Sequence, residues 1–127
     1  MDKKITLPFG SKQFLIELLE DGYATYYVED AENLIRLGER SLFETRKNVL
    51  YAFENIFNQK TFNYKGANIF HVLNFAGPHA SIHASPKSNG DLDIYWSNVD
   101  NPMSRMATLT SDDVNRFVED MEKLNFA

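Results

Sequence analysis

The chain has 127 residues, of which 43% are hydrophobic and 24% charged. This length and composition predict one folded domain, residues 1–127, built around a single core. Eighteen Asp and Glu against thirteen Lys and Arg give a net charge of −5. That sign is wrong for binding through many phosphates, so nucleic acid is not an expected partner. The absence of cysteine excludes disulfides, thiolate metal sites and cysteine nucleophiles.

Nothing in the sequence points to a membrane or to a targeting segment. No apolar run approaches the roughly 20 residues that span a bilayer, and Pro8 and Gly10 interrupt the short apolar stretch near the N-terminus. We therefore expect a cytoplasmic protein without a membrane partner. The six glycines form neither a Walker loop nor a dinucleotide-binding turn, so no cofactor is expected.

The first structural signal is the Asp21-Gly22 pair, which lies between two runs rich in aromatic and branched residues. Asp-Gly suits a two-residue type I′ turn, so the flanking runs are predicted to form a β-hairpin. With that turn Ile16 faces Tyr27, and one face of the hairpin carries Leu15, Leu19, Ala24, Tyr26 and Val28. We assign no element to the residues before this hairpin.

Residues 29–40 follow as an acidic connector, with a short helix predicted over 31–37 and ended by Gly38. Ser41 and Glu44 have the spacing of a capping box, which predicts a helix over about 41–59. Its apolar stripe is expected to pack in the core. The stripe consists of Leu42, Phe43, Val49, Leu50, Phe53, Ile56 and Phe57.

Four short strands are predicted next, at 61–64, 68–75, 80–85 and 92–97, and tight turns make them antiparallel. Residues 99–108 are interpreted as a loop or an irregular edge. A last helix over about 110–125 begins with a cap at Thr110 and has an apolar stripe that includes Phe117. The expected fold is α+β, an antiparallel sheet of about five or six strands packed against the two helices. No internal repeat is apparent.

Polar side chains alternate with apolar ones along the third and fourth of these strands. A five-residue connection places His83 opposite Tyr95 and Ser85 opposite Asp93, if the apolar faces match. One hypothesis is therefore a small hydrolase or RNA-processing enzyme that uses His83 with His79, Tyr95 and Asp93. The solvated face of any antiparallel sheet would look the same. On a strand His79 and His83 lie about 13 Å apart, so no metal site is expected.

Acidic residues gather around the first hairpin and on the last helix, together with tyrosines. Such a surface favours a non-enzymatic protein that recognises a basic protein, as an immunity protein, antitoxin or inhibitor would. The candidate partner-binding residues are Glu17, Glu20, Asp21, Tyr23, Tyr26, Asp112, Asp113, Glu119 and Asp120. A third hypothesis is a ligand-binding module with a pocket between sheet and helices. The sequence gives no indication of oligomeric state.

Overall fold

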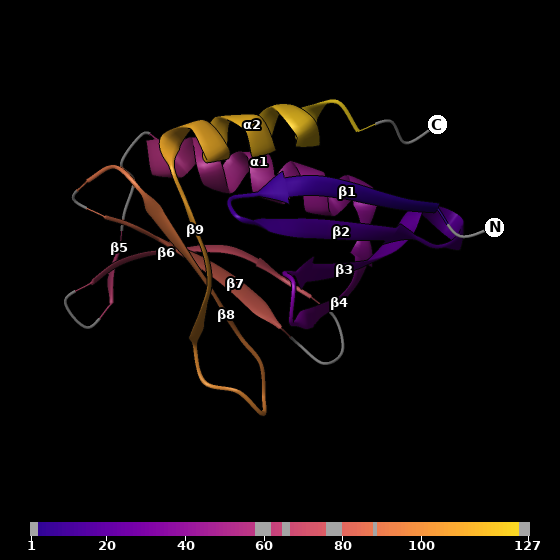
Figure 1. The fold of residues 1–127 in the computed structure, drawn as a ribbon, viewed down its shortest axis with the longest axis horizontal. Helices are drawn as coiled ribbons and strands as arrows, with labels where there is room; N and C mark the ends of the chain where they lie inside the picture. Colours follow the sequence, from indigo (N-terminus) through magenta and orange to yellow (C-terminus); the bar gives the residue numbers. More distant parts are fainter. Residues whose placement is uncertain (1–2, 58–61, 65–66, 76–79, 88, 125–127) are drawn as a thin grey trace.

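The computed structural model describes residues 3–57, 62–64, 67–75, 80–87 and 89–124, and these form two antiparallel sheets and two helices (Figure 1). The first sheet is the meander β1 (Lys3–Phe9), β2 (Lys12–Leu18), β3 (Tyr23–Glu29) and β4 (Leu34–Ser41). The second is β5 (Phe62–Tyr64), β6 (Ala67–Asn74), β7 (Ser81–Pro86), β8 (Leu92–Ser97) and β9 (Ser104–Leu109). The α+β class and antiparallel pairing are confirmed. The single sheet is wrong, because the strands divide between two sheets.

Both helices begin where the capping residues predict. Helix α1 (Leu42–Phe57) follows Ser41, whose hydroxyl accepts a hydrogen bond from the Glu44 amide at 3.3 Å. Helix α2 (Ser111–Glu122) follows Thr110, which forms a complete capping box with Asp113. Among the described residues, no helix is long and apolar enough to cross a membrane.

Three strands were not predicted from the sequence. β1 occupies the N-terminal stretch, where Pro8 is tolerated because β1 is an edge strand. β4 replaces the helix predicted over 31–37, and β9 replaces the loop predicted over 99–108. Helix α1 also exposes Phe43, which was expected in its buried stripe, while Ile56 and Phe57 of that stripe lie outside the described side chains.

The first predicted hairpin exists, but its register is shifted by one residue. Ile16 pairs with Tyr26 rather than with Tyr27, because the loop contains the three residues Glu20–Gly22 instead of two. Asp21 and Gly22 both have positive φ in this loop. A shift of one residue exchanges the two faces of a strand, so Tyr26 points into the core.

The order of elements repeats within the chain. Residues 3–57 form four antiparallel strands and a helix, and residues 67–122 form the same series, β6 to β9 followed by α2. We call these segments repeat 1 and repeat 2. The order alone would be weak support for structural equivalence, but the turns and strand irregularities also correspond in detail.

The turn between the third and fourth strand is the same in both repeats. The side-chain oxygen of Asp30 accepts from the amides of residues 32 and 33 at 2.9 and 2.8 Å, and that of Asn98 accepts from residues 100 and 101 at 2.9 and 2.8 Å. The two hydrogen bonds to Asp30 are the main reason why the pKa of its carboxyl group lies below the ordinary value. The repeats are therefore related by an offset of 68 residues at this turn.

A β-bulge after this turn corresponds as well. Tyr27 pairs with Arg36, and Tyr95 pairs with Arg105. In each repeat the next residue of the fourth strand, Leu37 or Met106, is the extra residue of the bulge and is buried. From the bulge onward the offset is 69, which makes the two helix caps, Ser41 and Thr110, equivalent.

The helices join the two repeats. Each helix contacts the last strand of its own repeat and the first strand of the other, so α1 packs on β4 and β6, and α2 on β9 and β1. Figure 1 shows α1 and α2 side by side above the sheets. At the centre of the molecule, the centroid of the Phe117 ring lies 5.1 Å from that of Phe9, 5.3 Å from that of Phe14 and 6.1 Å from that of Phe53.

The β1–β2 turn also crosses between the repeats. Gly10, with φ of +65°, lies so close to β9 that an added Cβ would come within 2.8 Å of the Thr108 carbonyl oxygen. Next to it the Lys12 ammonium donates to the Met106 carbonyl oxygen and lies 3.7 Å from the Asp30 carboxylate. The turn therefore fixes the first sheet against the edge strand of the second.

A buried polar group distinguishes the cores of the two repeats. Repeat 1 places Tyr26, Arg40 and Thr45 at the positions of Ile94, Leu109 and Val114 in repeat 2, counted from the equivalent bulges and caps. The Tyr26 hydroxyl has no hydrogen-bond partner among the described residues. Burial raises the pKa of Tyr26 to about 12, although Thr45 and the Arg40 guanidinium oppose the rise.

Tyr26→Phe is expected to remove a specific loss of stability at high pH. The folded-state pKa of about 12 exceeds the ordinary value of 10.0, so the neutral phenol stabilises the fold below pH 10 and this contribution is lost as the pH rises towards 12. The loss is about 1.4 kcal/mol for each pH unit. Urea unfolding at pH 9 to 12 measures it. The exposed control Tyr51→Phe should retain the wild-type alkaline loss, and equal curves for the two variants would contradict the assignment.

Candidate functional site

The polar strip predicted on the second sheet is present with its predicted register. His83 pairs with Tyr95, and Ser85 pairs with Asp93. The apolar side chains of the same strands, Ile82 and Ile94 among them, are buried on the opposite face. His79, the fourth residue of the enzyme hypothesis, lies outside the described residues.

Within this strip Asp93 is engaged by other side chains of the sheet. The Thr108 hydroxyl donates to its carboxylate at 2.7 Å, and the Lys87 ammonium lies 3.9 Å from it. Because Asp93 is buried, these contacts compensate for the loss of water around the carboxylate. Asp93 thus has a structural role that accounts for its position without catalysis.

The acidic candidates occupy different environments. Glu20, Asp21, Asp112 and Glu119 are exposed, whereas Glu17 and Asp120 are half-buried. Glu17 accepts a hydrogen bond from the Tyr27 hydroxyl at 3.3 Å. Asp113 serves the helix cap, since its carboxylate accepts from the Thr110 amide.

Of the two candidate tyrosines, only Tyr23 is on the surface. Its side chain is 52% exposed, whereas Tyr26 has no exposed surface. The expectation that Tyr26 is available to a partner is therefore wrong, and the cause is the three-residue loop that shifts the hairpin register.

A surface hollow of about 380 Å³ lies between the β2–β3 loop and the start of α1. Leu18, Leu19 and Tyr23 line it from the hairpin side, and Leu42 and Phe43 line it from the helix. Three of these apolar side chains are exposed: Leu19 by 41%, Tyr23 by 52% and Phe43 by 61%. Asp21, Gly22 and Ser41 complete the lining.

Repeat 2 has polar residues at the corresponding positions. The two loops are equivalent, because the Leu19 amide donates to the Tyr23 carbonyl and the Lys87 amide to the Asp91 carbonyl, both at 2.8 Å. Lys87 and Asp91 thus occupy the places of Leu19 and Tyr23. Counted from the helix caps, Asp112 occupies the place of Phe43.

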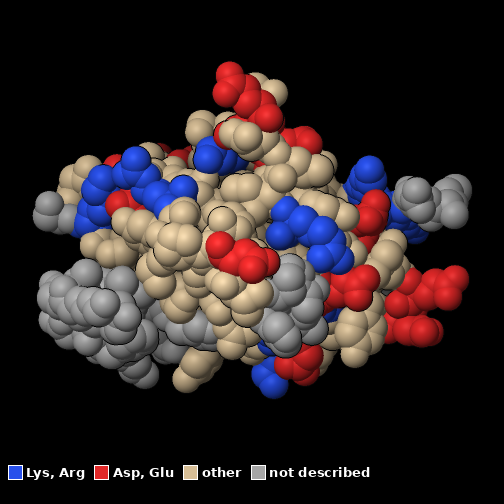
Figure 2. Space-filling view, turned by 90° about the horizontal axis from the view of Figure 1, so that it is seen from below, with Lys and Arg blue, Asp and Glu red and all other residues tan. Residues whose placement is uncertain are grey.

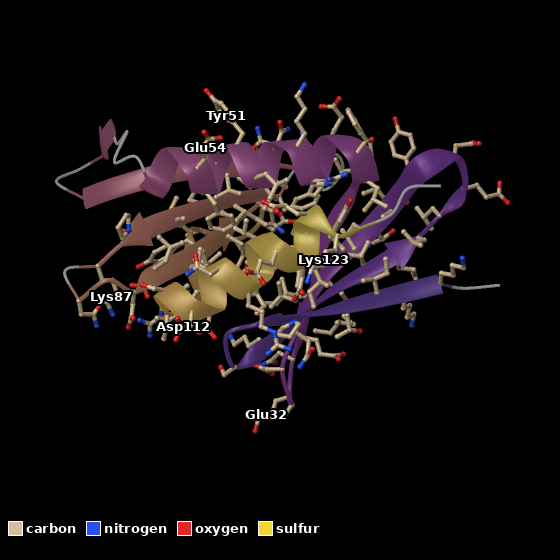
Figure 3. The ribbon with its side chains drawn as sticks, turned by 90° about the horizontal axis from the view of Figure 1, so that it is seen from above. Glu32, Tyr51, Glu54, Lys87, Asp112 and Lys123 are labelled. Atoms are coloured by element: carbon tan, nitrogen blue, oxygen red, sulfur yellow. The ribbon has the colours of Figure 1, made fainter. Side chains whose placement is uncertain are left out.

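In repeat 2 the loop also contacts the helix directly. The Ser111 hydroxyl donates to the Gly90 carbonyl oxygen at 3.5 Å. In repeat 1 the residue equivalent to Ser111 is Leu42, and the hollow lies at the same place. Figure 3 shows Lys87 and Asp112 at the end of the molecule where repeat 2 makes this contact.

The outer faces of the helices also differ, with an aromatic residue on α1 where α2 has an acidic one. Tyr51, 66% exposed, is ten residues after the cap of α1, and Asp120 is ten residues after the cap of α2. Figure 3 shows Tyr51 and Glu54 pointing away from α2. We call Leu19, Tyr23, Phe43 and Tyr51 the α1 surface; their equivalents in repeat 2 are Lys87, Asp91, Asp112 and Asp120.

The face opposite the helices carries both signs of charge, with Lys and Arg between groups of Asp and Glu (Figure 2). No group of three or more His, Asp or Glu that could hold a metal ion occurs among the described residues.

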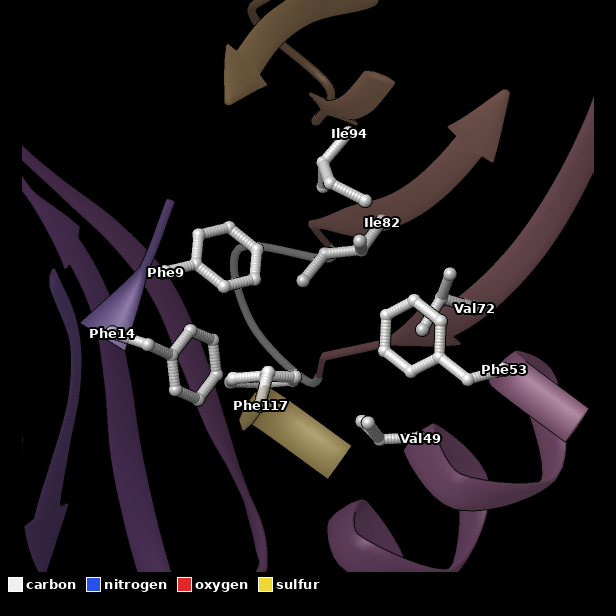
Figure 4. A pocket seen from close by; sticks show the side chains of 8 residues that line it. All are labelled: Phe9, Phe14, Val49, Phe53, Val72, Ile82, Ile94 and Phe117. Carbon is white, nitrogen blue, oxygen red and sulfur yellow. The ribbon is translucent and has the colours of Figure 1, made fainter. Parts of the chain in front are cut away.

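The interior offers little room for a ligand at the centre of the core. Figure 4 shows apolar side chains from both sheets and both helices around a cavity of about 20 Å³. Ligand pockets usually enclose about 300–1,000 Å³, and a cavity with a wholly apolar lining stays dry. The cavity is therefore a packing gap and gives no support to the ligand-binding hypothesis.

Sequence reasoning missed Leu19, Phe43 and Tyr51 as surface residues. Phe43 and Leu19 were assigned to apolar faces, and nothing local separates an exposed aromatic from a buried one. A comparison of the two repeats would have separated them, since each is replaced by a charged residue in repeat 2. Comparison of the chain with known protein families, characterised proteins and solved structures found no match.

Proposed function

We propose that this chain is a non-enzymatic binding protein that recognises a basic protein partner through the α1 surface, as an inhibitor, immunity protein or antitoxin does. One observation carries the proposal. The four exposed apolar positions of the α1 surface are charged at the equivalent places in repeat 2, so the backbone does not require apolar residues there. Clustered exposed apolar side chains cost solubility and are typical of interaction sites.

Electrostatics support a positively charged partner. The chain has a net charge of −5, the lining of the hollow includes Asp21, and Glu20 and Glu44 are exposed sequence neighbours of lining residues. Opposite charge accelerates encounter, while buried aromatic anchors supply most of the affinity. The acidic outer face of α2 then contributes long-range attraction and solubility rather than the contact itself.

Photo-crosslinking in the native cells tests this proposal. A benzophenone amino acid is placed at position 43 in one variant and at the equivalent position 112 in another, since both sites are exposed. Position 43 should give an adduct with one basic protein, and position 112 should not. An adduct from position 112 alone would assign binding to the α2 face, and no adduct from either would refute a stable protein partner at these surfaces.

A further inference from the structure

We infer that the hollow of the α1 surface is an anchor pocket for one large apolar side chain of the partner, next to a Lys or Arg of the same partner segment. This inference rests on the proposed function and specifies its recognition chemistry. The occupant is thus a short stretch of basic polypeptide rather than a flat protein face.

The lining of the hollow is part polar and part apolar, and its apolar part favours an apolar side chain. About 380 Å³ is near the lower end for pockets that enclose small ligands, so the hollow takes a small part of a partner. Leu18, Leu19 and Leu42 provide aliphatic surface, and Tyr23 and Phe43 provide two aromatic rings. An apolar group that enters removes both its own surface and that of the lining from water.

The rim favours a cation beside that side chain. Asp21 belongs to the lining, and Glu20 and Glu44 are exposed neighbours in sequence of lining residues. Two cations neighbour the lining in the same sense, Lys3, which pairs with Leu18 across the β1–β2 ladder, and Arg40, which precedes Ser41, so the three carboxylates outnumber them. The exposed Tyr23 ring adds a face on which a guanidinium or ammonium group can stack.

Repeat 2 has a loop–helix contact and charged side chains that are absent from the pocket in repeat 1. There the loop is closed on the helix by the Ser111 contact with Gly90, and the equivalent side chains carry charges of both signs, Lys87 with Asp91 and Asp112. Repeat 1 lacks the positive member, because Leu19 replaces Lys87. The change from Lys to Leu opens apolar surface, and the ion-pair partner of Lys87, the Asp93 carboxylate at 3.9 Å, is replaced by Thr25 in repeat 1.

Blocked dipeptides test the pocket without knowledge of the partner. The probes are N-acetyl, C-amide forms of Phe-Arg, Phe-Glu and Gly-Arg, titrated into the isotope-labelled protein and followed by amide chemical shifts. Phe-Arg should bind with a Kd of about 1–10 mM and about threefold more tightly than Phe-Glu. Its shifts should localise to Gly22, Tyr23, Leu42 and Phe43, with the equivalent amides of Gly90, Asp91 and Asp112 unchanged.

The control variant Phe43→Asp, at a side chain 61% exposed, should keep the fold and lose these shifts. Equal binding of Phe-Arg and Phe-Glu would overturn the cationic part of the inference, and Gly-Arg binding as well as Phe-Arg would overturn the apolar part. If no probe binds while crosslinking at position 43 still captures a basic protein, the pocket is refuted and the proposed function stands. If the probes bind and no partner is captured, the proposed function fails instead.

Discussion

Phe117→Ala should destabilise the protein by about 3–5 kcal/mol, the cost of a buried phenylalanine truncated to a methyl group. Phe117 is 2% exposed and its ring contacts Phe9 and Phe14 of the first sheet and Phe53 of α1. Truncation therefore removes contacts between the repeats as well as apolar burial. It also enlarges the small cavity that Phe117 already lines.

Guanidinium unfolding of Phe117→Ala and of the exposed control Glu119→Ala measures this effect. The control should change the free energy of unfolding by less than about 0.5 kcal/mol. A loss below about 1 kcal/mol for Phe117→Ala would mean that α2 does not hold the two repeats together.

Gly10→Ala should cost about 2–5 kcal/mol, from two separate causes. A left-handed backbone costs a residue with a Cβ roughly 1–2 kcal/mol, and Gly10 has φ of +65°. The added Cβ would also lie 2.8 Å from the Thr108 carbonyl oxygen, which forces the β1–β2 turn away from β9 and adds about 1–3 kcal/mol of overpacking.

Gly22→Ala is the matched control, because Gly22 has φ of +78° and no atom within 4 Å of the added Cβ. It should show only the backbone cost of about 1–2 kcal/mol. The difference between the two variants in thermal or urea unfolding reports the contact between the repeats. No difference would show that the turn does not press against β9.

The helices and strands whose apolar residues recur with an unbroken period were predictable from the sequence. Both helices follow capping residues and have apolar stripes, and the β7–β8 register follows from matching two alternating faces across a five-residue connection. Each of these follows from local chemistry that nothing elsewhere in the chain overrides.

β4 and β9 escaped prediction for one shared physical reason. Each contains a bulge that turns two consecutive residues inward, Leu37 with Gly38 and Met106 with Ala107. A bulge destroys the alternation by which a strand is recognised. In β4 the resulting spacing of apolar residues resembled a helix, and in β9 it resembled a loop.

The division into two sheets and the internal repeat could not be predicted from the sequence. Strand pairing within a meander is local, but the grouping of strands depends on how the helices cross from one repeat to the other. The repeat is visible in hydrogen bonds that Asp30 and Asn98 both make. Different residue types satisfy the same turn, so sequence identity is a poor guide to it.

The candidate surface depended on that repeat. The acidic residues of the last helix were visible in the sequence, but the apolar equivalents on α1 were assigned to the core. The apolar pattern of α1 alone does not separate Phe43, which is exposed, from Phe53, which is buried.

Exchanging the residues of the α1 surface for those of repeat 2 tests the central claim most directly. The variant Leu19→Lys, Tyr23→Asp and Phe43→Asp replaces three exposed apolar side chains by residues that the same backbone carries in repeat 2. Affinity for the captured partner should fall at least about 100-fold, with an unchanged circular dichroism spectrum and urea midpoint. The control variant Asp112→Asn, Glu119→Gln and Asp120→Asn should slow association by only a few-fold at low salt. Full affinity in the first variant, with loss of binding in the second, would contradict the account and place the partner on the acidic face of α2.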